Sequence, residues 1–99
     1  MGGEKRKTVL IVDDDALVAL NASTALEGAG YGVIVARSGE EAVAAVAKPP
    51  AIDLILMDIK LGAGMDGTEA AEIILRGHDI PVVFFSSHSR PEIVARTEK

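Results

Sequence analysis

The chain lacks cysteine and tryptophan, and its only aromatic residues are one tyrosine and two phenylalanines among 99 residues. Without cysteine there can be no disulfide, no thiolate metal site and no thiol chemistry. With so few aromatics, the core must be built from Val, Ile, Leu, Ala and Met. Hydrophobic residues make up 48% of the chain, which is enough for one small packed domain and argues against disorder.

A positive net charge and long apolar segments are also missing. The formal net charge is -5, so the chain has no basic footprint for nucleic acid. Basic residues near the N-terminus are not followed by an apolar stretch, which excludes a signal peptide, and the longest apolar runs are too short to span a bilayer. We therefore expect a cytoplasmic domain over residues 8–99 with a flexible tail over 1–7, and neither a nucleic-acid nor a membrane partner.

Four short apolar runs, at residues 8–13, 32–36, 52–58 and 80–85, alternate with segments of helical character. The runs are continuous rather than alternating, as in strands that are buried on both faces of a parallel sheet. A helix is predicted after each run. The order β-α-β-α-β-α-β-α predicts an α/β domain whose parallel sheet is covered by helices on both faces.

Capping signals mark the expected helix starts. Asp14 or Asp15 can cap the first helix, and the capping boxes Ser38-x-x-Glu41 and Ser89-x-x-Glu92 open the second and the last. The third helix is expected from about Thr68 to Arg76. Apolar residues at roughly helical spacing indicate a stripe along the first helix, formed by Leu17, Leu20, Thr24 and Leu26.

Carboxylates follow two of the predicted strands. Asp13, Asp14 and Asp15 close the first run, and Asp58 closes the third. The carboxyl ends of neighbouring parallel strands meet at one edge of the sheet, where ligands bind in open α/β folds. Carboxylates gathered there repel one another and need a hard divalent cation, for which Mg²⁺ is the best candidate. An aspartate beside such a cation can act as a nucleophile toward phosphorus.

Two further motifs fall on this edge. The Ser86 hydroxyl could hydrogen-bond an oxygen of a group carried on Asp58, or Ser86 could be only a turn residue. The segment from Gly62 to Gly67 matches G-x-G-x-x-G. It does not follow the strand directly, however, and no acidic residue ends the next strand, so we interpret it as a loop in which Asp66 caps the third helix rather than as a dinucleotide site.

Together, and in this order, these motifs resemble the receiver domain of two-component response regulators. The resemblance covers nearly the whole chain from Thr8 and rests on Val12-Asp-Asp14, Ser38-Gly-Glu-Glu-Ala42, Asp53-Leu-Ile-Leu-Met-Asp58, Met65-Asp-Gly67 and Pro81-Val-Val-Phe-Phe-Ser86. It implies a flavodoxin-like (CheY-like) doubly wound sheet of strand order 2-1-3-4-5.

The resemblance also implies a function. Asp58 would be the phosphoacceptor and Ser86 the switch hydroxyl, while Asp13, Asp14, Asp58 and the backbone carbonyl of Lys60 would bind Mg²⁺. The phosphoryl donor would be a phosphohistidine on a sensor histidine kinase or a phosphotransfer protein. Such a domain is a relay substrate that assists its own phosphorylation and dephosphorylation, rather than an enzyme that turns over a free metabolite.

The sequence departs from the family pattern in two places. The loop between Asp58 and Met65 looks one residue longer than usual and lacks the common Met-Pro. The fifth strand and helix and the family's active-site lysine have no counterpart before Lys99. With order 2-1-3-4, the strand of residues 81–85 would be an exposed edge. This predicts homodimerisation or swapping through that edge, or poor stability if the chain is monomeric.

Two alternatives stay open. The first is a receiver-fold binding or dimerisation module without phosphotransfer, which the missing lysine favours. The second is a haloacid-dehalogenase-like phosphatase, in which Asp13 would be the nucleophile and Asp15 the acid/base. Leu17 stands where that motif usually has Thr or Val, and the chain is short for such an enzyme.

Overall fold

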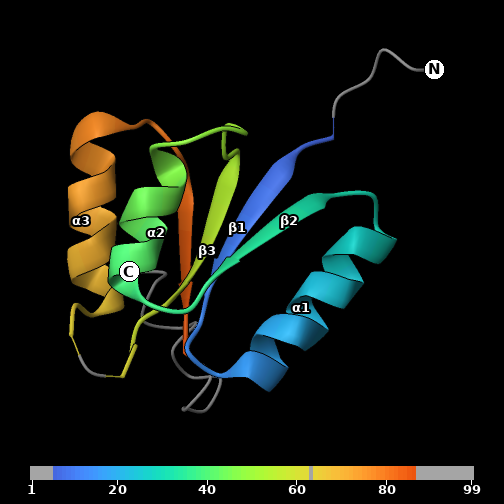
Figure 1. The fold of residues 1–99 in the computed structure, drawn as a ribbon, viewed down its shortest axis with the longest axis horizontal. Helices are drawn as coiled ribbons and strands as arrows, with labels where there is room; N and C mark the ends of the chain where they lie inside the picture. The colour runs from blue at the N-terminus through green and yellow to red at the C-terminus, as the bar shows by residue number, and fades with distance from the viewer. Residues whose placement is uncertain (1–5, 63, 87–99) are drawn as a thin grey trace, which may run out of the picture.

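In a computed structural model, the chain forms a four-stranded parallel sheet with helices on both faces (Figure 1). The structure describes residues 6–62 and 64–86. Its elements are, in order, β1 (Thr8–Val12), α1 (Ala16–Gly28), β2 (Gly32–Ala36), α2 (Gly39–Val46), β3 (Leu54–Asp58), α3 (Gly67–Gly77) and β4 (Val82–Phe85). The predicted strands and the first three helices are confirmed, whereas the helix predicted from Ser89 lies outside the described residues.

The strand order is β2-β1-β3-β4, which confirms the predicted order 2-1-3-4. β1 lies in the middle of the sheet, where Leu10 is opposite Ile34 of β2 on one side and Ile55 of β3 on the other. All pairs are parallel because each connection between neighbouring strands contains a helix. α1 covers one face of the sheet, and α2 and α3 cover the other (Figure 1).

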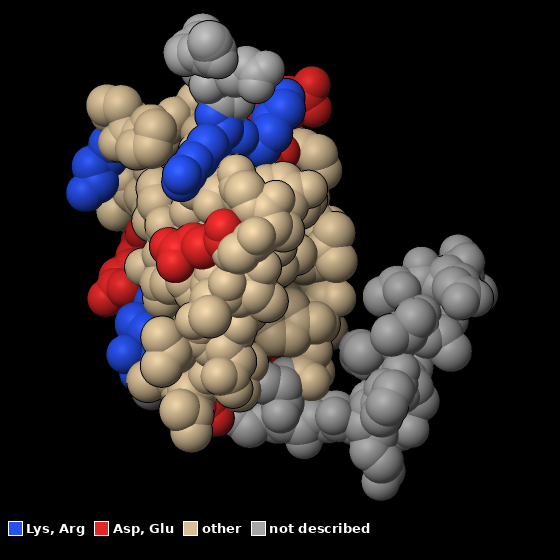
Figure 2. All heavy atoms as spheres, turned by 90° about the vertical axis from the view of Figure 1, so that its right-hand side faces the viewer, with Lys and Arg blue, Asp and Glu red and all other residues tan. Residues whose placement is uncertain are grey.

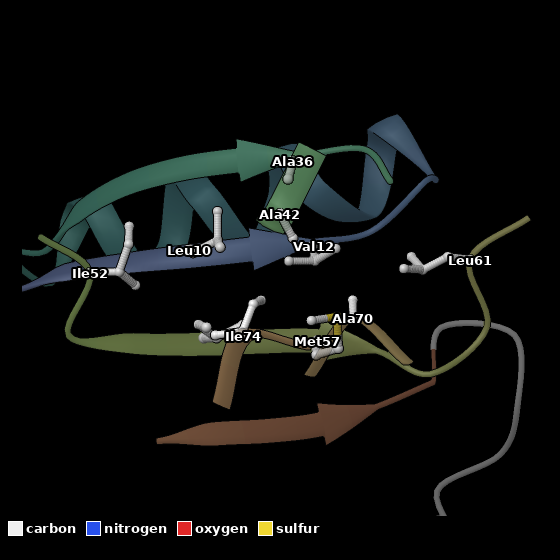
Figure 3. Packing of buried hydrophobic residues seen from close by; sticks show 10 residues of the cluster. Leu10, Val12, Ala36, Ala42, Ile52, Met57, Leu61, Ala70 and Ile74 are labelled. Carbon is white, nitrogen blue, oxygen red and sulfur yellow. The ribbon is translucent and has the colours of Figure 1, made fainter. Parts of the chain in front are cut away.

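Alternate residues of the strands build a separate core on each face. The larger core lies between the sheet and helices α2 and α3 (Figure 3). Its most deeply buried members are Leu10, Val12, Ala42, Ile55, Met57, Ala70 and Ile74. The smaller core lies under α1 and contains Val9, Ile11 and Ala19. The buried members of both cores are aliphatic apart from Met57 in the larger one, against which the half-buried Phe84 also packs, in keeping with the scarcity of aromatics.

Only part of the apolar stripe predicted along α1 faces the sheet. Leu17 and Leu20 are 65% and 59% exposed, whereas Ala19, Ala22 and Leu26 pack against the strands. Residues 16–26 include no charged side chain, so no charged residue marks the solvent-facing side of the helix. Figure 2 shows the side of the molecule on which α1 lies, and residues other than Lys, Arg, Asp and Glu cover most of it. No helix within the described ranges is both long and apolar enough to cross a bilayer.

The helices are capped at the positions that the sequence predicts, but one of the predicted hydrogen bonds has a different partner. Asp15 caps α1 by accepting from the amides of Leu17 and Val18. At α2, the Ser38 hydroxyl accepts from Glu41 N, but the Glu41 carboxylate accepts from Arg37 N, one residue earlier than a capping box requires. The complete capping box is at α3, between Asp66 and Glu69.

Candidate functional site

Three carboxylates converge at the carboxyl edge of the sheet. Asp13 directly follows β1, Asp14 is the next residue, and Asp58 ends the neighbouring strand β3. One oxygen from each lies within 4.8 Å of the others. Asp13 and Asp58 are fully buried and Asp14 is half-buried. The predicted meeting of the two acidic motifs at one edge is therefore confirmed in its geometry.

Burial sets the electrostatics of this acidic cluster, by which we mean Asp13, Asp14 and Asp58. Burial raises the pKa of Asp13 above its usual 3.8, and the Asp58 and Asp14 charges raise this pKa further. The amide of Asp15, which donates to Asp13 Oδ1 at 2.9 Å, opposes this shift by stabilising the ionised form. The ionised cluster is therefore unfavourable by itself, and a bound cation would relieve it.

The acidic cluster fits a hard divalent cation. Asp13 Oδ2 and Asp14 Oδ1 are buried, and neither accepts a hydrogen bond. A buried carboxylate oxygen without a partner is costly, and coordination to Mg²⁺ would satisfy it because Mg²⁺ prefers oxygen ligands and binds through one or two carboxylates plus water. The donor set contains no nitrogen or sulfur, which would favour zinc or other transition metals.

The backbone around Asp58 is held on two sides. Ile59 N donates to the carbonyl of Phe85 in β4 at 2.8 Å, and Gly67 N donates to the carbonyl of Ile59 at 3.0 Å. Lys60 N donates to Asp58 Oδ1 at 3.2 Å. A side chain on Gly67 would overlap the carbonyl oxygen of Asp58. The strand end that carries Asp58 is thus fixed by β4 and by the start of α3.

The remaining residues that the sequence singled out lie around this cluster. Phe85, the last residue of β4, has Asp58 as its register partner, so the half-buried Ser86, which follows Phe85, lies at the same edge of the sheet. Lys60 is exposed, and the metal-binding role implied for its carbonyl stays a prediction. Asp15 is exposed, serves as a helix cap and is not one of the converging carboxylates. The phosphatase alternative therefore lacks its acid/base at the cluster.

Two residues that the sequence did not single out also reach this edge. Arg37, which follows β2, donates from Nη2 to the carbonyl of Asp14 at 2.9 Å. Glu40 accepts from Met65 N at 3.4 Å and so contacts the loop between β3 and α3. Both follow β2, whose carboxyl end lies at the same edge as that of β1. That placement was the available signal, but a single charged residue after a strand is too common to be singled out.

Comparisons with known proteins agree with this geometry. A family model described as response regulator receiver domain matches residues 9–99. The phyllosphere-induced regulator PhyR of Methylorubrum extorquens is 36% identical over 81 residues, which are 81% of this chain and 30% of that protein. The transcriptional regulatory protein PdtaR of Mycobacterium tuberculosis is 34% identical over 93 residues, which are 91% of this chain and 43% of that protein. The chain thus spans less than half the length of these relatives.

Solved structures resemble the chain over most of its length. The N-terminal domain of a response regulator/sensory box/GGDEF 3-domain protein from Carboxydothermus hydrogenoformans has a TM-score of 0.79 and 44% identity, over 86% of this chain and 68% of that one. The anti-anti-sigma factor PhyR from Bartonella quintana has a TM-score of 0.68 and 34% identity, over 83% of this chain and 34% of that one. Because the family model matches all but the first few residues, the chain belongs to the response regulator receiver domain family and has its CheY-like fold.

Proposed function

We propose that this domain, over residues 8–99, accepts a phosphoryl group on Asp58 from a phosphohistidine of a sensor histidine kinase or phosphotransfer protein. The observation that carries the proposal is the acidic cluster, in which buried Asp58 meets Asp13 and Asp14 at the carboxyl edge of the sheet. Asp13, Asp14, Asp58 and the carbonyl of Lys60 would hold Mg²⁺. The proposed compartment is the cytoplasm.

The chemistry is a transfer between two protein side chains. A carboxylate oxygen of Asp58 forms a bond to phosphorus as the bond from phosphorus to the imidazole nitrogen of the donor breaks, and the electron pair of that bond leaves with the imidazole. Mg²⁺ would neutralise charge on the phosphoryl oxygens and lessen their repulsion from the carboxylates. Lys60 N donates a hydrogen bond to Asp58 Oδ1 and so orients the acceptor carboxylate. The Ser86 hydroxyl would donate a hydrogen bond to a phosphoryl oxygen.

The test is a titration with beryllofluoride, which mimics a phosphoryl group on aspartate, in the presence of Mg²⁺. We expect saturable NMR shifts at the amides of Asp13, Asp14 and Ser86, and their loss in Asp58→Asn. Asp53→Asn is the matched control, because Asp53 precedes the same strand at its other end and an amide oxygen can still accept from Thr8 N. If Mg²⁺ shifts these amides and beryllofluoride causes no further change, the domain has a metal site but does not accept a phosphoryl group.

A second candidate function is a receiver-fold module that binds a protein partner without phosphotransfer. It is favoured by the similarity to a PhyR whose structure is described as an anti-anti-sigma factor. The exposed Leu17 and Leu20 of α1 offer apolar surface for such contact. This candidate predicts the result just described, in which Mg²⁺ shifts the cluster amides and beryllofluoride adds nothing.

We also propose that the chain forms a homodimer through β4. Within residues 6–62 and 64–86, β4 pairs with β3 alone, and its Val83 is 50% exposed. An apolar edge strand without a charged residue can pair with a second copy. Light scattering should show a dimer that Val83→Lys dissociates. A folded monomer at high concentration would contradict this part of the proposal.

A further inference from the structure

The Arg37 side chain bridges the end of β2 and the loop that carries the metal ligands of the proposed function. Val12 and Ala36 are register partners at the ends of β1 and β2, and Asp13 N donates to the carbonyl of Ala36 at 3.1 Å. One residue further on, Arg37 Nη2 donates to the carbonyl of Asp14 at 2.9 Å. The β1–α1 loop is therefore attached to β2 first through the main chain and then through a guanidinium group.

Arg37 is well placed to act as a fixed attachment because its own main chain is held. Its amide donates to Glu41 Oε1 at 2.8 Å, and Glu41 lies in the first turn of α2. The next residue, Ser38, caps that helix. The base of the Arg37 side chain is thus tied to α2, and its guanidinium group carries that constraint to the loop of Asp14.

We propose that Arg37 is a positioning residue, which fixes the Asp14 carboxylate in the acidic cluster by holding the Asp14 carbonyl. This inference rests on the proposed Mg²⁺ site. Asp14 Oδ1 is buried without a hydrogen-bond partner, so no hydrogen bond to that oxygen keeps it aimed at the cluster. The loop has a second support in the bond from Asp15 N to Asp13 Oδ1. Arg37 supplies the corresponding support for Asp14 from the β2 side.

The charge of Arg37 and its hydrogen bond affect Mg²⁺ binding in opposite directions. A cation beside the site repels Mg²⁺, so removing the charge alone would strengthen metal binding, by an amount that salt screens. Removing the support lets the Asp14 carboxylate move and would weaken metal binding. Loss of a group that orients a metal ligand commonly costs about 10-fold or more in affinity. The direction of the change therefore separates positioning from simple electrostatics.

The experiment is a titration of the 99-residue chain with Mg²⁺ alone, followed by amide shifts of Asp13, Asp14 and Asp15. Arg37→Met keeps the length and apolar stem but removes charge and donors, and we expect its Mg²⁺ affinity to fall about 10-fold. Arg37→Lys keeps a donor and the charge and should recover part of the loss. Arg76→Met is the matched control, because Arg76 is an exposed arginine in the last turn of α3.

The results separate a positioning role of Arg37 from a general loss of stability. Urea midpoints in EDTA that match across the variants would show that any loss of Mg²⁺ affinity is local to the site. Faster hydrogen exchange of the Asp15 amide in Arg37→Met would support the same conclusion without metal. Equal or tighter Mg²⁺ binding by Arg37→Met would overturn the role of Arg37 while leaving the proposed function intact. A wild-type chain that does not bind Mg²⁺ would overturn both.

Discussion

Replacing Gly67 by alanine tests how closely α3 is seated against the strand that carries Asp58. Gly67 is the first residue of α3 and is buried. A Cβ there would overlap the carbonyl oxygen of Asp58 and lie 3.0 Å from the Cα of Ile59. Both obstacles are main chain, so no rotamer change can relieve them. Either the start of α3 or the end of β3 must shift.

The expected cost follows from that contact. Overpacking typically destabilises a protein by about 1–3 kcal/mol. Because the obstacle here is backbone, we expect a cost at the upper end of this range, about 3 kcal/mol. The higher helix propensity of alanine returns at most about 1 kcal/mol. The net loss is therefore roughly 2 kcal/mol, which lowers the urea midpoint by roughly 1.5 M for a domain of this size.

Urea unfolding followed by circular dichroism measures this loss, with Gly77→Ala as the control. Gly77 ends the same helix, lies outside the left-handed region, and has nothing within 4 Å of its would-be Cβ. Gly77→Ala should be neutral or stabilising by about 0.5 kcal/mol. Equal midpoints for the two variants would refute the close seating of α3. A shifted beryllofluoride response in Gly67→Ala alone would show that the displacement reaches Asp58.

Three other changes have expected outcomes. Burial raises the pKa of Asp13 above 3.8, so without metal the stability associated with this group is fully present below its unfolded-state pKa and is lost as pH rises through its folded-state pKa. In EDTA, the urea midpoint of Asp13→Asn should therefore exceed that of wild type by an amount that grows with pH. A difference that does not depend on pH would contradict this. Ser38→Ala removes the α2 cap and should lower the free energy of unfolding, measured in urea, by about 1 kcal/mol, whereas Ser38→Gly should lower it by only a few tenths of a kcal/mol. Equal losses for the two variants would argue against the cap. Ile74→Ala, at a side chain 1% exposed, should cost about 2–5 kcal/mol, while Ile73→Ala, at 37% exposed, should cost far less; similar losses would contradict the assigned faces of α3.

Much of the fold could be predicted because continuous apolar runs and helix caps are local signals. The run that ends in Asp58 and the triplet from Asp13 placed the acidic cluster at one edge of the sheet, since parallel strands bring their carboxyl ends together. Strand order came instead from the resemblance to a family, because the spacing of strands does not by itself determine their neighbours. The structure confirms both over the described residues.

The remaining features depend on tertiary contacts that a sequence pattern does not encode. The buried side of α1 is set by Ala19 and Ala22, whose small side chains allow close approach to the sheet, together with Leu26, while Leu17 and Leu20 of the same pattern are exposed. The Arg37 contact joins residues from different loops, and its long side chain has many alternative conformations in the unfolded chain. Glu41 was predicted to bond Ser38 N but accepts from Arg37 N, a difference of one residue that depends on how the chain leaves β2.

The central position of β1 has a consequence for how the chain folds. The paired residues of neighbouring strands are far apart in the sequence. Thr8 and Gly32 are 24 residues apart. Leu10 and Ile55 are 45 residues apart, and Ile55 and Val82 are 27 residues apart. The sheet over the described residues therefore contains no hairpin, and each pairing must close a long loop before any strand contact is gained, which slows folding. During synthesis β1 emerges first but cannot be enclosed until β3 follows. Asp13 and Asp58 thus come together only when β1 and β3 pair, so the acidic cluster cannot form before the middle of the sheet.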